Sequence, residues 1–306
     1  MSSESKDEVK ATGAFPVADR LIFLIYLVLI TIPLLFPLGL PIAIAPATNE
    51  SYFAIEGLAE GSVVLFEQDN SFGTWAELAP PDIAMTRHLF KMMEENKIRL
   101  IFYSGSVQGN QLSQRVIKDY VGRPYPFNND PDYGKYWVHL GWIPGGEPIL
   151  AGMVSNMVNI APIDLYNIPT ESMEIFQYIS SKALPNDIIT GDDINLFLVT
   201  HCTSPDSWAR QWGGYGDPQR GFEHGNMIHI FSAGSVPYAM PFIGKGQMRS
   251  YLGGQRAGAE YELLINKPGL GAAYMDAQDF AHLFGIVLIV GSNIFYLYEK
   301  QKVTKK

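Results

Sequence analysis

Residues 21–45 constrain this chain more than any other stretch, because they include no charged side chain over 25 consecutive positions. A helix of that length reaches roughly 37 Å at about 1.5 Å per residue, against a bilayer hydrocarbon core of about 30 Å. A second uncharged run, residues 280–298, lies near the C-terminus. The two runs predict transmembrane helices on either side of one domain, which residues 46–279 are long enough to form.

The first run has two further features. Pro33, Pro37 and Pro41 recur at every fourth position, so the predicted helix should bend or end early. Residues 43–45 read Ala-Ile-Ala, the pattern of a signal-peptide cleavage site. The apolar stretch is much longer than the roughly 7–15 residues of a signal sequence, which favours an uncleaved anchor.

Charge predicts the topology. The net charge is −9, and the segments 1–20 and 299–306 carry −1 and +3, which leaves −11 for the middle of the chain. This excess of acid argues against nucleic acid as a partner and against a domain lying flat on anionic lipid. The four lysines of the C-terminal tail favour a cytoplasmic C-terminus. Two spans then place the N-terminal tail in the cytoplasm and the domain outside it.

The middle of the chain alternates short apolar runs with helical stretches. Strands are expected at residues 62–67, 98–103, 136–140, 194–200 and 227–231, and helices at residues 80–96, 110–120, 171–180, 205–212 and 247–264. Alternating elements of this kind predict a doubly wound, mainly parallel α/β sheet of the Rossmann-like type. The single cysteine, Cys202, excludes a disulfide within the chain.

Ligands of open parallel sheets bind beyond the carboxyl ends of the strands, and several polar residues fall there. Glu67 and Asp69 follow the first strand, and the turn at residues 104–109 (SGSVQG) precedes a helix, as an anion cradle would. This turn lacks the spacing of the known phosphate motifs, so an ordinary strand-to-helix turn is the alternative. The predicted ligand-binding residues are Ser104, Gly105, Ser106, Gly109, Trp142, Gly145, Gly146, Thr203, Gly234 and Ser235.

A catalytic centre is a second hypothesis for the same edge. Ser106, His201 and Asp69 could meet there as nucleophile, base and orienting acid, although no G-x-S-x-G motif is present. No cofactor is predicted. No metal site is predicted either, because the histidines and Cys202 lack the spacing of metal ligands.

The second span has a surface suited to close helix packing. Ala281 and Gly285 form a small-xxx-small pair, which lets another helix approach. The partner could be the first span, a second copy of the chain or another membrane protein. Lipid is the expected surrounding in each case.

Four segments of the sequence carry a resemblance: FYSGSVQG (102–109), LGWIPGGE (140–147), ARQW (209–212) and RAGAEYELLINKPGLGAA (256–273). In these segments the chain resembles a group of uncharacterised two-span membrane proteins of bacteria and archaea. The resemblance implies a domain held between two spans, and it transfers no activity to any residue. We therefore expect a membrane-anchored, extracytoplasmic binding or assembly module of a larger membrane complex. The alternative is a membrane-anchored hydrolase acting at the carboxyl edge of the sheet.

Overall fold

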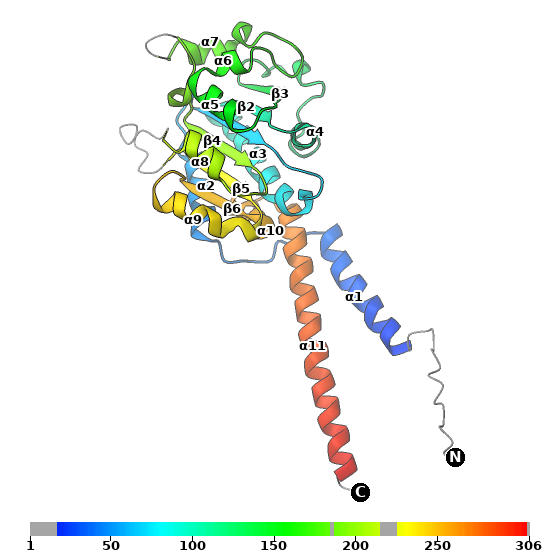
Figure 1. The fold of residues 1–306 in the computed structure, drawn as a ribbon. Coiled ribbons are helices and arrows are strands. Elements are labelled where there is room, and N and C mark those ends of the chain that lie inside the picture. Colours follow the sequence, from blue (N-terminus) through cyan, green and yellow to red (C-terminus); the bar gives the residue numbers. More distant parts are fainter. Residues whose placement is uncertain (1–16, 184–186, 215–224, 305–306) are drawn as a thin grey trace, which may run out of the picture.

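The centre of the protein is a six-stranded sheet in which every pair of neighbouring strands is parallel. The computed structural model describes residues 17–183, 187–214 and 225–304 (Figure 1). The strand order is β3-β2-β1-β4-β5-β6. The chain adds strands on one side of β1 up to β3 and then on the other side from β4 to β6, which confirms the predicted doubly wound α/β fold. The strands are β1 (Val63–Gln68), β2 (Arg99–Ser104), β3 (Trp137–Trp142), β4 (Leu196–Thr200), β5 (Met227–Phe231) and β6 (Ser250–Gly253).

Helices cover both faces of this sheet, because successive side chains of a buried strand point to opposite sides. Leu65 packs into one hydrophobic core and Phe66 into the other. The helices of the domain are α2 (Pro46–Glu56), α3 (Trp75–Asn96), α4 (Val107–Arg115), α5 (Glu147–Ser155), α6 (Met157–Ile160), α7 (Glu174–Ser180), α8 (Asp206–Trp212), α9 (Val236–Gly244) and α10 (Gly254–Leu264). Shorter turns of helix are the π-helix Val116–Val121 and the 3-10 turns Phe127–Asn129, Thr170–Ser172, Gly191–Asp193 and Ala233–Ser235.

The predicted helix at residues 247–264 is wrong in its first part, which forms the edge strand β6 before α10 begins. The two elements meet at Gly253 and Gly254. Gly254 has a φ of +65°, and a Cβ there would lie 3.2 Å from the backbone nitrogen of Ala233. This conformation suits glycine, so the chain can leave the sheet and turn directly into a helix.

The first predicted span is shorter than expected. Helix α1 (Val17–Leu35) has 19 residues and ends ten positions before residue 45, as the proline spacing predicts. Its uncharged part, residues 21–35, measures about 22 Å, which is less than a hydrocarbon core of about 30 Å. Residues 36–45 form a non-helical linker into α2. The predicted helix over 21–45 is therefore corrected to α1 followed by this linker.

The second predicted span lies within a longer helix, α11 (Leu270–Thr304). Among the described residues, its part 270–298 is the one helix long and apolar enough to cross a membrane. Helices α1 and α11 project from the same end of the domain and pack against each other, with the rings of Tyr26 and Phe284 6.1 Å apart (Figure 1). Residues 1–16 and the lysines at 305 and 306, which belong to the predicted tails, lie outside the described residues.

A buried carboxylate holds the linker against α11. Asp276 is 2% exposed and accepts the backbone N–H groups of Leu38, Gly39 and Leu40 at 2.7, 2.9 and 3.0 Å. A non-helical linker has few backbone partners of its own, so this one side chain replaces several of them. The contact joins the two membrane-proximal segments across more than 230 positions of sequence.

Two further buried acids act in the same region. Glu262 of α10 accepts N–H groups from the first turn of α11, and Glu260 accepts from the start of α2. Both carboxylates therefore satisfy donors at helix starts, where no partner exists within the helix. The donors are the backbone N–H groups of Gly269, Gly271 and Ala272 for Glu262, and the Ala45 N–H and Thr48 hydroxyl for Glu260.

Replacement of Asp276 should loosen the linker formed by residues 36–45. In an Asp276→Ala variant three N–H groups lose their acceptor, at a cost of roughly 1 kcal/mol each. We expect amide hydrogen exchange at Leu38, Gly39 and Leu40 to accelerate in detergent-solubilised protein, measured by mass spectrometry. Asp279→Ala, which removes an exposed carboxylate one turn further along α11, should leave these amides unchanged. Equal exchange in the two variants would contradict the role of Asp276.

Candidate functional site

A cavity of about 170 Å³ lies at the carboxyl ends of β1, β2 and β4, where the strand order reverses. The rule for open parallel sheets places ligands at this crevice. Helices α5 and α8 close the cavity on one face of the sheet. The side chains and backbone that carry its chemistry are Glu67, Asp69, Tyr103, Gly105, His201 and Trp208.

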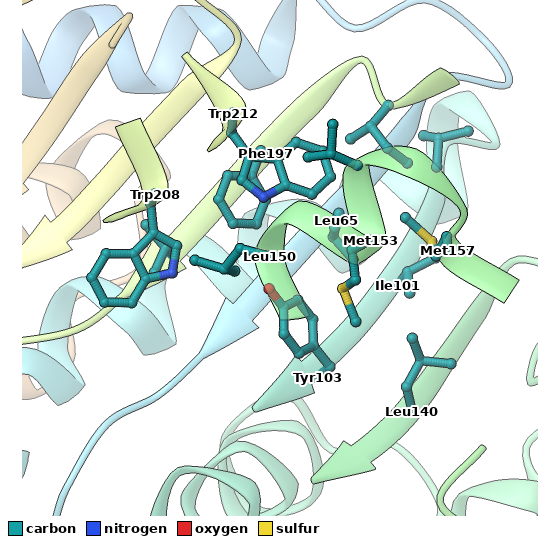
Figure 2. Close-up of a cluster of buried hydrophobic side chains, with 14 of the residues drawn as sticks. Leu65, Ile101, Tyr103, Leu140, Leu150, Met153, Met157, Phe197, Trp208 and Trp212 are labelled. Atoms are coloured by element: carbon teal, nitrogen blue, oxygen red, sulfur yellow. The ribbon is translucent and has the colours of Figure 1, made fainter. Parts of the chain in front are cut away.

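Glu67 is the most unusual of these groups. It ends the apolar run of β1, and its side chain is 4% exposed. Its Oε2 accepts the Tyr103 hydroxyl at 2.7 Å and the Trp208 indole N–H at 2.6 Å. Figure 2 shows these two donors directed toward the same region beside Leu150. No described residue donates to Oε1 of this cavity-lining carboxyl, which is left for a ligand or water.

The environment of Glu67 favours its protonated form. Burial raises its pKa to about 7, and the negative charge of Asp69 adds to the rise. The hydrogen bonds from Tyr103 and Trp208 act in the opposite direction, because they stabilise the carboxylate. Near neutral pH the group therefore exists in both protonation states. Such a perturbed carboxyl in a cleft is typical of functional sites.

Asp69 and His201 face each other across the crevice, as the sequence predicts. The His201 Nε2 lies 3.8 Å from Asp69 Oδ2. The backbone N–H of Thr203 donates to Nδ1 at 3.2 Å, so Nδ1 is the acceptor nitrogen and the proton of the neutral ring is on Nε2. Burial lowers the pKa of His201 against the opposing effect of Asp69, which favours this neutral ring.

Gly105 borders the space between the two acids. A Cβ at this position would lie 3.1 Å from Glu67 Oε1 and 3.5 Å from Asp69 Oδ2. Both oxygens therefore adjoin one small volume, which the missing side chain keeps open. Gly105, a predicted ligand-binding residue, therefore lines the cavity, and a side chain at this position would occupy part of it.

The serine hydroxyls of the turn at residues 104–109 form hydrogen bonds within the turn itself. Ser106 is the N-cap of α4, and its Oγ accepts the Gly109 N–H at 3.0 Å. The Ser104 hydroxyl donates to the Ser106 carbonyl at 3.0 Å and lies 3.3 Å from Asp69 Oδ1. These contacts are those of a strand-to-helix turn, the alternative to an anion cradle.

The other predicted residues divide between the cavity and its surroundings. Gly146 lines the cavity, whereas the 49% exposed Trp142 covers the neighbouring loop and donates its indole N–H to the Gly105 carbonyl at 3.2 Å. Thr203 holds the ring of His201. Gly145, Gly234 and Ser235 are not among the lining residues, and Ser235 instead donates to the Cys202 carbonyl at 3.0 Å.

Three helices at this edge have an acidic side chain in their first turn. Helices α3, α5 and α8 carry Glu77, Glu147 and Asp206 in their first turns. Glu147 also binds the Arg210 guanidinium through two hydrogen bonds of 2.9 and 2.8 Å. No lysine or arginine is among the described residues that line the cavity. The site is therefore electronegative.

The predicted catalytic group is assembled in part. Asp69 and His201 meet, but no described contact joins Ser106 to His201, and the Ser106 hydroxyl is engaged in the helix cap. Within the described ranges, no three His, Cys, Asp or Glu side chains are grouped to hold a metal ion.

The sequence does not point to two residues of this site. By pattern alone, Tyr103 is part of an apolar strand and Trp208 is a core aromatic residue. The available signal is Glu67, an acid at the end of an otherwise apolar buried run. A buried carboxylate needs donors, and these come from neighbouring elements that the sequence alone does not bring together.

The chain was also compared with known proteins. It matches no known protein family, no curated protein and no solved structure.

The buried carboxyl of Glu67 should lower the stability of the protein at high pH. The ordinary pKa of 4.5 rises to about 7 in the folded state, so folding favours the proton and stability falls as pH rises through this interval. At pH 8 the cost is on the order of 3 kcal/mol. In Glu67→Gln the amide oxygen can still accept from Tyr103 and Trp208 without a charge.

We therefore expect Glu67→Gln to have a higher Tm than the wild type at pH 8 and a similar Tm at pH 4.5, measured by thermal unfolding in detergent. Glu95→Gln removes the same charge from an exposed site on α3 and should change the Tm little at either pH. A Glu67→Gln variant destabilised at pH 8 would refute the destabilising role of this carboxylate.

Proposed function

We propose that this protein is a membrane-anchored α/β module that binds a small polar molecule in the cavity between β1 and β4. The observation that carries the proposal is the carboxyl of Glu67, which is 4% exposed and presents Oε1 to the cavity without a donor from the described residues. Burying such a group costs free energy unless a partner pairs with it. A ligand that does so at this site offsets the cost.

The dimensions of the cavity limit the ligand. Pockets for drug-sized molecules measure about 300–1,000 Å³, and this cavity is about 170 Å³. The molecule, or the part of it that enters, is therefore small. Its position at the reversal of strand order agrees with the general placement of ligands in such sheets.

The membrane anchor is α11, with α1 packed beside it. Large apolar side chains of both helices are exposed, such as Leu24 at 57% and Ile289 at 63%, which is favourable only in contact with lipid or another protein. We further propose that both helices enter the bilayer, that both termini are cytoplasmic and that the domain lies outside. The small residues Ala281 and Gly285 offer a contact for a second copy or another membrane protein.

A hydrolase remains the second candidate because Asp69 and His201 face each other. It has less support than binding. A nucleophile must be within hydrogen-bond reach of its base, and the Ser106 hydroxyl instead accepts the N–H of Gly109.

Filling the cavity should abolish binding without unfolding the domain. We suggest screening wild-type protein in detergent against about a hundred compounds with few non-hydrogen atoms, including small amines, alcohols and carboxylates, by ligand-observed NMR. Gly105→Ala places a methyl group beside Glu67 and Asp69, and should eliminate the signals of true site ligands. Gly234→Ala is the matched control, since its Cβ meets nothing within 4 Å.

Two results would refute the binding proposal. One is the absence of any ligand in the screen. The other is a set of ligands that bind equally to wild type and to Gly105→Ala. Loss of binding in both glycine variants would show that the effect is not specific to the cavity.

The topology is testable by labelling. Single cysteines at Ser3, Asn129 and Thr304, in a Cys202→Ser background, are treated in intact cells with a membrane-impermeant thiol reagent. We expect labelling at Asn129 alone. Labelling at Ser3 and Thr304 without Asn129 would place the domain in the cytoplasm, and labelling on opposite sides for the two termini would exclude two spans.

A further inference from the structure

The cavity also indicates the chemical class of its ligand, and this inference rests on the binding function proposed above. We propose that the ligand is a small organic amine whose protonated ammonium group lies between the carboxylates of Glu67 and Asp69. The ligand class follows from charge, the position of the acceptor oxygens and the apolar wall of the cavity that includes Trp208.

The first argument is charge. Glu67 and Asp69 line the cavity, and no lysine or arginine lies among its described lining residues. Arg210 is close in the fold but already binds Glu147 in a two-pronged ion pair, so it does not balance these acids. Like charges in a small cavity repel each other, and a cation between them removes the repulsion.

The same edge of the sheet disfavours an anion. Sheets of this type often bind phosphate at free helix N-termini. Here the N-cap of α4 is filled by Ser106, and α5 begins with Glu147. An anion would therefore meet the carboxylates of Glu67, Asp69 and Glu147 and no lysine or arginine among the described lining residues.

The second argument is the direction of the available acceptors. Glu67 Oε2 is saturated by Tyr103 and Trp208, which leaves Oε1 for a donor in the cavity. The oxygens Glu67 Oε1 and Asp69 Oδ2 lie within 3.1 and 3.5 Å of one point, the Cβ position of Gly105. An ammonium group carries three N–H donors and can satisfy both oxygens at once.

The third argument is the apolar wall. Trp208 lines the cavity while its indole N–H is held by Glu67. Together with Ile149 and Leu150, its ring gives the cavity an apolar wall that can contact the carbon atoms of an organic ligand. A bare divalent metal is less suitable, because no group of three potential ligands is present among the described residues.

Binding of an ammonium group should displace the proton of Glu67. The groups that face this carboxyl are Tyr103 from β2, Trp208 from α8, and Asp69 and His201 from the ends of β1 and β4. Glu147 of α5 also lines the cavity and is paired with Arg210. With a pKa of about 7, Glu67 is mostly protonated at pH 6 and mostly ionised at pH 8 before the amine binds. A cation prefers the ionised form, so affinity should rise with pH by up to about tenfold over this range.

Three probes of similar size test the inference: 2-aminoethanol, ethane-1,2-diol and glycolate, which are cationic, neutral and anionic at neutral pH. Their dissociation constants are measured for the full chain in detergent by ligand-observed NMR at pH 6 and pH 8. We expect 2-aminoethanol to bind at least tenfold more tightly than the other two at pH 8. Its affinity should fall by up to about tenfold at pH 6.

Variants of the lining residues test whether 2-aminoethanol binds in this cavity. Glu67→Gln and Asp69→Asn should each weaken 2-aminoethanol at least tenfold at pH 8, and Glu67→Gln should also remove the pH dependence. Gly105→Ala should abolish binding. Glu95→Gln removes the same charge from an exposed position and should leave binding unchanged.

The outcomes separate this inference from the function on which it rests. Binding of the diol or of glycolate as tight as that of the amine, and lost in Gly105→Ala, would overturn the ammonium inference while supporting a ligand cavity. The ammonium inference would also be overturned, and the ligand cavity supported, if 2-aminoethanol does not bind and the cavity-specific ligands of the wider screen carry no ammonium group. No cavity-specific ligand of any kind would overturn both.

Discussion

The parallel direction of all six strands is the constraint on which the rest of the structure depends. Each strand must be followed by a crossover, so every carboxyl end reaches the same edge of the sheet. The reversal of strand order beside β1 separates the crossovers to opposite faces and leaves a crevice between β1 and β4. Glu67, Asp69 and His201 meet there because of topology, although His201 is more than 130 residues from both acids in sequence.

The main chemical feature of this crevice is the buried carboxyl group of Glu67. Glu67 lies at the end of a buried strand, and its two donors come from β2 and α8. Burial and the nearby charge of Asp69 raise the pKa of this carboxyl, and the two hydrogen bonds offset only part of that rise. Under the proposed binding function, a ligand that pairs with this carboxyl would recover the free energy that its burial costs. In that proposal, stability and function are opposed at one residue.

The type and order of most elements could be predicted from the sequence, because buried parallel strands are apolar runs such as residues 100–103. The prediction fails at β6, where the pair Gly253–Gly254 falls inside a helical pattern although its conformation depends on close contact with Ala233. The predicted first span is also too long. Residues 36–45 are as free of charge as the residues before them, but the helix ends at Leu35.

The sequence predicts at which edge of the sheet the candidate site lies, but not the roles of most of its residues. Asp69 and His201 are expected to meet because parallel strands bring their ends together. The role of Ser106 could not be predicted, because the same hydroxyl serves equally well as a ligand-binding group or a helix cap, and only the position of Gly109 decides between them. The roles of Tyr103 and Trp208 depend on packing between elements distant in sequence.

The buried acids at the base of the domain have a mechanical consequence. Asp276 fastens the linker to α11, and Glu262 joins the first turn of α11 to α10. The domain is therefore attached to its longest helix without a flexible stalk, unlike receptors joined to their anchors by disordered linkers. A rotation or tilt of α11 would turn the whole sheet with it. The direction in which the cavity opens is consequently set by how this helix sits in its surroundings.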